Sequence, residues 1–131
     1  MVAVLVTATG VGSTGSLADR ATRGNPADAR AHAERMVKAA RSMVDHGKEG
    51  RLLALADEAL QVIAHGKGAM DAVPFPGNRH ARDAMAELTE AVDQAANARS
   101  HAEQGHQDVA TSHAKKSLSH ARRGLSHARA L

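Results

Sequence analysis

The sequence predicts an all-α protein, an up-down-up-down four-helix bundle made of two duplicated antiparallel helical hairpins. Alanine is abundant and Phe75 is the sole aromatic residue besides histidine, whereas strands favour β-branched and aromatic side chains. Apolar residues recur at steps of three and four along most of the chain, which is the helical period. The 131 residues suit one domain, and the absence of cysteine excludes disulfides and thiolate metal sites.

The first predicted hairpin spans residues 28–68. The apolar stripe of its first helix ends at Gly47 and Gly50, and that of its second helix ends at Gly66 and Gly68. The stripe residues are Met36, Val37, Ala40, Met43 and Val44 in the first helix, and Leu52, Leu53, Ala56, Ala59, Leu60 and Ile63 in the second. A loop over residues 69–78 follows, and its two prolines make it stiff.

The second predicted hairpin spans residues 79–131 and turns at Gly105. Its stripe residues are Met85, Leu88, Val92, Ala95 and Ala102, then Val109, Ala110, Ala114, Leu118, Ala121, Leu125 and Ala128. Gly124 should weaken the last helix by about 1 kcal/mol relative to alanine. Residues 46–51 align with residues 101–106 at an offset of 55, which also brings His65 onto His120 and indicates an internal duplication. The short turns favour a monomeric bundle over residues 28–131.

Residues 1–27 form a separate segment, with the features of either an export signal or a disordered tail. Residues 1–18 carry no charge, begin with an apolar run and offer Ser16 and Ala18 as small residues for a cleavage site, although no basic residue precedes the run. If residues 1–18 are a signal peptide, we expect a periplasmic or secreted protein, and otherwise a cytoplasmic one. No run reaches the roughly 18 apolar residues that a membrane helix needs.

Histidines recur every seven residues near the carboxyl end, at His106, His113, His120 and His127. Seven residues are nearly two helical turns, so these imidazoles line one side of one helix. The interval returns elsewhere, because His32 and His46 are fourteen residues apart and His80 and His101 are twenty-one apart. Since neutral imidazole is the commonest protein ligand for transition metals, the pattern predicts metal binding.

Histidines seven residues apart lie roughly 10 Å apart along a helix, so a second ligand for each ion must come from the neighbouring helix. Folding the last helix back about Gly105 brings level the positions whose numbers sum to 207. These pairs are His101 with His106, Gln94 with His113, Glu87 with His120, and His80 with His127. In the first hairpin the sum is 97, which pairs His32 with His65 and His46 with Arg51. The candidate metal ligands are therefore His32, His46, His65, His80, Glu87, His101, His106, His113, His120 and His127.

Catalysis is not expected. The helical Glu-x-x-His pairs of di-iron bundles are absent, because Glu103 and His106 straddle Gly105 and have no counterpart. Adjacent serine and histidine residues point to different faces of a helix. The alternative to metal binding is a helical interaction module that docks a protein or polyanion through the basic face of the last helix. That face carries Lys115, Lys116, Arg122, Arg123 and Arg129. The net charge is only +3 and aromatic residues that could stack on bases are missing, so a nucleic-acid partner is disfavoured.

Residues 45–50, 64–67 and 101–106, together with the His-Ala-Lys and His-Ala-Arg steps of the last helix, share a pattern with a known family. In these segments the chain resembles the histidine-rich small metal-binding proteins of the bacterial periplasm. The resemblance covers most of residues 28–131 and implies an exported four-helix bundle that takes up copper and other divalent ions. The family's turns read His-Gly-x-x-Gly-His, whereas the first turn here ends in Arg51 and the second has Ala102 in place of glycine. We therefore expect a smaller metal load than is usual in the family.

Metal ions are accordingly the expected partners, bound at surface histidine pairs for sequestration, storage or transport. With nitrogen and oxygen ligands and no sulfur, Cu(II) should bind tightest, followed by Ni(II) and Zn(II) in an order that the ligands leave open. Because the ligand is neutral imidazole, binding should weaken as the pH falls through about 6.5.

Overall fold

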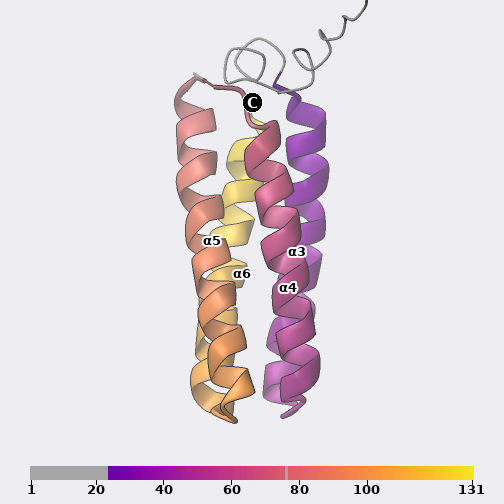
Figure 1. Ribbon diagram of the computed structural model, residues 1–131. Coiled ribbons are helices and arrows are strands. Elements are labelled where there is room, and N and C mark those ends of the chain that lie inside the picture. The colour runs from indigo at the N-terminus through magenta and orange to yellow at the C-terminus, as the bar shows by residue number, and fades with distance from the viewer. Residues whose placement is uncertain (1–23, 76) are drawn as a thin grey trace, which may run out of the picture.

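The computed structural model describes residues 24–75 and 77–131, and in them it confirms the four-helix bundle (Figure 1). The helices are α3 (Pro26–Lys48), α4 (Leu52–Ala72), α5 (Arg79–Glu103) and α6 (Gln107–Arg129), and the described residues contain no strand. None of these helices combines the length and apolar character that crossing a membrane requires. Residues 1–18, interpreted above as either an export signal or a disordered tail, lie outside the described residues.

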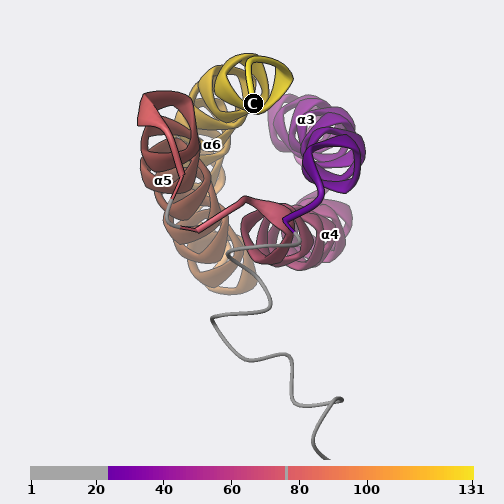
Figure 2. The ribbon, with the colours of Figure 1, turned by 90° about the horizontal axis from the view of Figure 1, so that it is seen from above.

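The helices run alternately up and down, and each packs against two neighbours. α3 contacts α4 and α6, and α5 contacts α4 and α6, so the four form a ring when viewed end-on (Figure 2). Figure 1 shows the α3–α4 and α5–α6 turns at one end of the bundle, with the connector between α4 and α5 at the other. We call the side of each hairpin that faces away from the other hairpin its outer groove; no connecting segment of the described residues runs along it.

Asparagine side chains set where α3 and α5 begin. Asn25 Oδ1 accepts a hydrogen bond from the backbone N–H of Asp28 at 3.1 Å, and Asn78 Oδ1 accepts one from Ala81 at 3.0 Å. Asparagine is among the strongest N-caps, and Pro26 suits the first helical position because its missing N–H would have no helical partner. α3 consequently starts two residues before the predicted boundary.

The two hairpin turns have the same geometry. Gly50 and Gly105 adopt φ values of 73° and 80°, the left-handed region that glycine enters at little cost. The N–H of Arg51 donates to the carbonyl of His46 at 2.9 Å, and the N–H of His106 donates to that of His101 at the same distance. The turns are thus equivalent at the offset of 55, as the predicted duplication requires.

Alanine makes up most of the core. In α5 and α6 the buried apolar residues are all alanine except for Leu88 and Leu125. The first hairpin adds larger side chains, among them Met36, Met43, Leu55 and Val62. Two residues predicted to lie in the apolar stripe of α4, Leu53 and Leu60, are instead exposed.

The predicted end of the second helix at Gly66 and Gly68 is wrong, since α4 continues to Ala72. Both glycines are packing positions. A Cβ atom on Gly66 would lie 2.5 Å from Val92 Cγ2, and one on Gly68 would lie 2.9 Å from the His32 ring. Glycine inside a helix costs about 1 kcal/mol, and close packing offsets that cost. The connector is therefore residues 73–78, shorter than the predicted loop over 69–78.

Gly124 in α6 is also a packing residue, so we expect Gly124→Ala to destabilise the bundle despite the better helix propensity of alanine. The new Cβ would lie 2.8 Å from Cδ2 and 3.0 Å from Cγ of the fully buried Leu88. Overpacking of this kind should lower the free energy of unfolding by about 1–2 kcal/mol in urea denaturation followed by circular dichroism. The exposed Ser126→Ala in the same helix serves as control and should stay within about 0.5 kcal/mol of wild type. A Gly124→Ala protein as stable as that control would contradict the packing role.

Candidate functional site

All four predicted pairs across the second hairpin are in contact. His80 Nδ1 lies 3.3 Å from His127 Nδ1, and His101 Nδ1 lies 3.4 Å from His106 Nδ1. His113 Nδ1 lies 2.7 Å from Gln94 Oε1, and His120 Nδ1 lies 2.6 Å from Glu87 Oε1. We call these four pairs the rungs; they follow the outer groove between α5 and α6, one heptad apart.

The distance between the two imidazole nitrogens suits a shared metal ion. Two nitrogens bound to one ion at about 2.0–2.1 Å lie roughly 2.9 Å apart at the right angle of tetragonal Cu(II) and roughly 3.3 Å apart at the tetrahedral angle of Zn(II). The His80–His127 and His101–His106 rungs show the larger separation with little side-chain movement needed. Without an ion, the same contact is a hydrogen bond in which one ring donates N–H to the other. An ion would replace that shared hydrogen.

The rungs remain pairs even at the crowded end of the groove near the turn. The His101 ring is 5.6 Å from that of His106 and stacks on that of His113 at 5.3 Å between centroids. Nevertheless, no group of three histidine, aspartate or glutamate side chains in residues 24–75 and 77–131 is arranged to hold one ion. Each rung therefore offers two protein ligands.

The first hairpin contains one histidine pair. The rings of His32 and His65 face each other across α3 and α4 with centroids 5.9 Å apart. Nδ1 of His32 is buried without a hydrogen-bond partner in the described structure, so a ligating nitrogen there is not engaged elsewhere. The absent side chain of Gly68 leaves room for this ring.

His46 is not brought to a second ligand. Its Nδ1 is buried and has no hydrogen-bond partner among the described residues, and its level position across the turn is Arg51. Arginine cannot bind a cation, because its guanidinium stays protonated in proteins and has no acceptor. The first turn thus copies the backbone of the second turn without copying its histidine pair.

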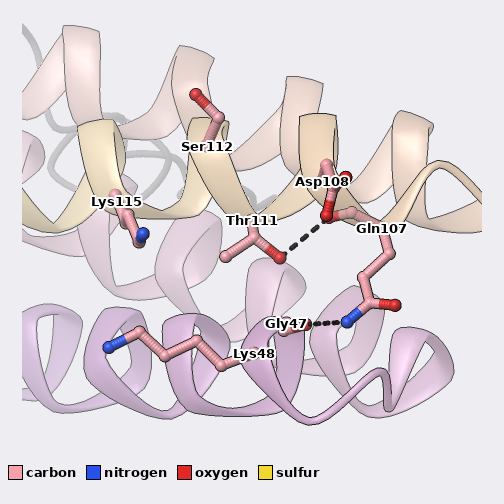
Figure 3. A pocket seen from close by; sticks show the side chains of 7 residues that line it. All are labelled: Gly47, Lys48, Gln107, Asp108, Thr111, Ser112 and Lys115. Carbon is pink, nitrogen blue, oxygen red and sulfur yellow. Dashed lines mark hydrogen bonds between the residues drawn. The ribbon is translucent and has the colours of Figure 1, made fainter.

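The hollows of the surface lie away from the rungs. One of about 350 Å³ lies between the end of α3 and the start of α6, and its lining includes Gly47, Gln107 and Lys115 (Figure 3). There the Gln107 amide donates to the carbonyl of Gly47 at 2.9 Å. A second hollow in the α3–α6 groove is lined by Lys48, Lys115, Arg122 and Arg123. Histidine lines neither of these two hollows, so both lie apart from the rungs.

A family model described as small metal-binding protein matches residues 4–123, most of the chain. The chain belongs to the small metal-binding protein family. A search of curated proteins finds no matching relative. In this small metal-binding protein, side chains of the kinds that can bind a metal ion lie in pairs on the outside of each hairpin. These pairs are the rungs and His32–His65.

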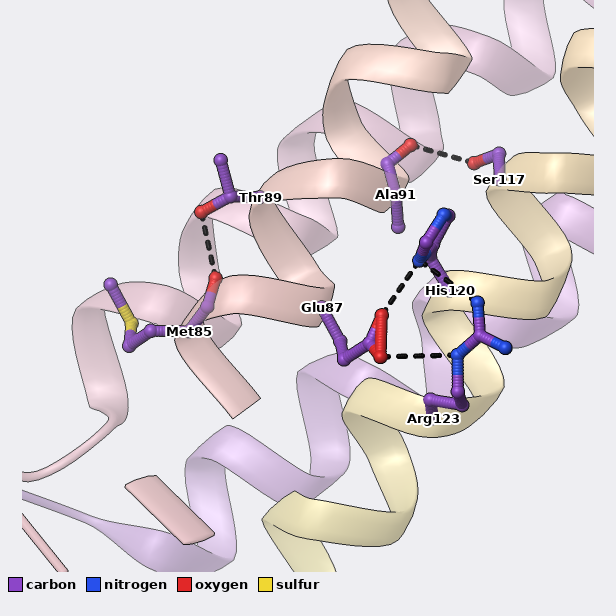
Figure 4. Close-up of polar contacts among 7 residues, drawn as sticks. All are labelled: Met85, Glu87, Thr89, Ala91, Ser117, His120 and Arg123. Atoms are coloured by element: carbon purple, nitrogen blue, oxygen red, sulfur yellow. Dashed lines mark hydrogen bonds and ion pairs between the residues drawn. The ribbon is translucent and has the colours of Figure 1, made fainter. Parts of the chain in front are cut away.

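One contact of this small metal-binding protein was not predicted from its sequence. Arg123 Nε lies 3.1 Å from Glu87 Oε2, and its Nη2 lies 3.1 Å from His120 Nδ1 (Figure 4). Arg123 was assigned to the solvated basic face instead. Residues three apart on a helix are neighbours, so the spacing places Arg123 beside His120, but it does not specify the contact with Glu87 on another helix. Gln94, in contrast, lies opposite His113 as predicted, although it is not among the candidate ligands.

Two histidines of the candidate sites have a lowered pKa. Burial lowers the pKa of His65 below its ordinary value of 6.5, and the nearby His32 and Arg35 lower it further. Burial also lowers the pKa of His113, with additional effects from His101 and Lys116. The neutral imidazole, which is the form that binds a metal ion, is therefore favoured at both positions.

We expect NMR titration of the metal-free protein to place the midpoints of His65 and His113 below 6.5. His32→Ala should raise the midpoint of His65 and leave that of His113 in place, because the charge of His32 contributes to one shift only. A His65 midpoint at or above 6.5 in the wild type would contradict the assignment.

The lowered pKa values of His65 and His113 also determine how the free energy of unfolding changes with pH. Since the folded pKa is below the unfolded one, the unfolded chain binds more protons in the interval between the two values. These two groups should therefore reduce stability as the pH falls from about 6.5 toward their lowered folded values.

Proposed function

We propose that this protein binds divalent transition-metal ions at paired side chains on its surface, with Cu(II) bound tightest, and acts in sequestration, storage or transport rather than in catalysis. The observation that carries the proposal is the Nδ1–Nδ1 separation of 3.3 Å in His80–His127 and 3.4 Å in His101–His106. Family membership supports metal binding in general. The choice of metal and the pairing mechanism are our inference from the ligands.

The ligand set favours Cu(II). The rungs supply imidazole nitrogen, one carboxylate and one amide oxygen, and no sulfur. For such ligands the affinity of divalent ions rises toward Cu(II), with Ni(II) and Zn(II) weaker. Each ion would keep open positions for water, because only two protein ligands reach it. Open sites suit exchange, whereas a permanent structural ion is held by a closed set of four ligands.

The pairing mechanism predicts strongly non-additive losses at His80 and His127. Once His127→Ala removes one ligand, the rung is broken, and adding His80→Ala should cost little more. We expect isothermal titration with Cu(II) at pH 7.5 to show a loss of about one bound ion in the single variant and nearly the same loss in the double variant.

The adjacent Ser126→Ala is the matched control for this cycle and should keep the wild-type stoichiometry. Equal and additive losses from the two histidines would contradict pairing while leaving metal binding intact. A wild-type chain that takes up no Cu(II) would contradict the proposal itself and favour the interaction module.

The equivalence of the two turns predicts that Arg51→His creates a new rung. Arg51 and His106 occupy the same turn position, and each donates its backbone N–H to a histidine carbonyl at 2.9 Å. A histidine at 51 should therefore meet His46 as His106 meets His101. We expect about one additional Cu(II) ion per chain in the same titration.

Arg51→Gln is the control, because it removes the same positive charge and adds no imidazole. It should leave the Cu(II) stoichiometry unchanged. If Arg51→His binds no more Cu(II) than Arg51→Gln, the prediction is contradicted, and two histidines at equivalent positions of a turn are not sufficient to form a metal site.

A further inference from the structure

The Glu87–His120 rung differs from the others in containing a resident cation. Glu87 comes from α5, while His120 and Arg123 come from adjacent turns of α6 (Figure 4). The carboxylate is shared: Oε1 lies 2.6 Å from His120 Nδ1, and Oε2 lies 3.1 Å from Arg123 Nε. The Glu87 and His120 side chains are 22% and 25% exposed, so both are partly shielded from water.

The other three rungs lack this feature. His80 and His127 contact each other, as do His101 and His106, and His113 contacts Gln94. Within the described residues, no hydrogen bond or ion pair joins any of these six side chains to lysine or arginine. Glu87–His120 is also the one described rung with a carboxylate, the ligand that most attracts a guanidinium.

A metal ion and Arg123 compete for the same groups. An ion on this rung would need Glu87, whose Oε2 lies 3.1 Å from Arg123 Nε, and Nδ1 of His120, which lies 3.1 Å from Arg123 Nη2 and would have to give up the proton that it donates to Glu87. Guanidinium keeps its charge at every physiological pH, so deprotonation cannot release it. An ion on this rung must therefore weaken or break the contact between Arg123 and the same carboxylate.

The Arg123 side chain has room to move away from Glu87. The Arg123 side chain is 54% exposed and also lines the hollow between α3 and α6, on the other side of its own helix. The guanidinium can therefore leave Glu87 without disturbing the core.

We propose that Arg123 is an internal competitor that weakens metal binding at the Glu87–His120 rung, so that this rung fills at a higher metal concentration than the histidine pairs and Arg123 sets its affinity. The inference rests on the proposed function, since it presumes that rungs bind ions. Because an exposed ion pair contributes modestly, removing Arg123 should tighten binding at this rung by about two- to fivefold.

The test is an NMR titration of the whole protein with Zn(II), a diamagnetic probe, following the imidazole signals of His120 and His127 and the Nε–H signal of Arg123. In the wild type, His127 should respond at lower Zn(II) than His120, and the Arg123 signal should shift together with that of His120. In Arg123→Ala the His120 midpoint should fall by about two- to fivefold. Arg122→Ala is the matched control, because it removes the neighbouring exposed charge. The His120 midpoint should change less in this variant, because salt screens the charge of Arg122, which does not contact Glu87 or His120.

The role of Glu87 gives a second, independent readout. In a Glu87→Gln background, Arg123→Ala should no longer change the His120 midpoint, because the group for which it competes has lost its charge. Equal midpoints in Arg123→Ala and Arg122→Ala, or a His120 response without movement of the Arg123 signal, would overturn the competition. If the His127 signal changes with Zn(II) and the His120 signal never does, the competitor role of Arg123 is contradicted while the proposed metal binding is not. If no histidine responds to Zn(II) or Cu(II), both fall.

Discussion

The small side chain of alanine sets the distance between α5 and α6, and that distance decides which groups can meet across the second hairpin. Helix axes pack about 8–10 Å apart, with the shorter values where the contact residues are small. Here the buried residues between the two helices are almost all alanine. The flanking side chains on the outer groove are therefore brought within hydrogen-bonding reach along the whole hairpin. Larger core residues would separate the helices and open every rung together.

Close helices alone would not pair the ligands, because their register must also be correct. The turn supplies the register: Gly105 in the left-handed region and the His106 N–H bond to the His101 carbonyl start α6 at a defined height and rotation. From that point, residues seven apart on α5 and on α6 stay level with one another, so His127 meets His80 at the far end of the groove. One backbone hydrogen bond at the turn thus determines a contact between residues forty-seven apart.

The fold and the rungs could be predicted from the sequence because they depend on local quantities. Helical rise, the heptad period and a glycine turn are enough to place His80 opposite His127. The continuation of α4 past Gly66 could not be predicted in this way, since the atom that fills its missing side-chain space is on Val92 in another helix. The unpaired state of His46 follows from Arg51 and was foreseeable, whereas the choice of Arg123 to bind Glu87 depends on rotamers that spacing does not specify.

The separation between rungs determines how the sites affect one another. Two divalent ions one heptad apart, roughly 10 Å, repel by about 1.7 kcal/mol in pure water. Physiological salt, with a Debye length of about 8 Å, reduces this repulsion to about 0.5 kcal/mol, little more than a twofold change in affinity. Neighbouring rungs can then be filled almost independently, and differences in affinity arise from the ligands of each rung. If the rungs hold ions as proposed, such a surface would take them up over a broad concentration range without an abrupt transition, which is the behaviour that sequestration and exchange require.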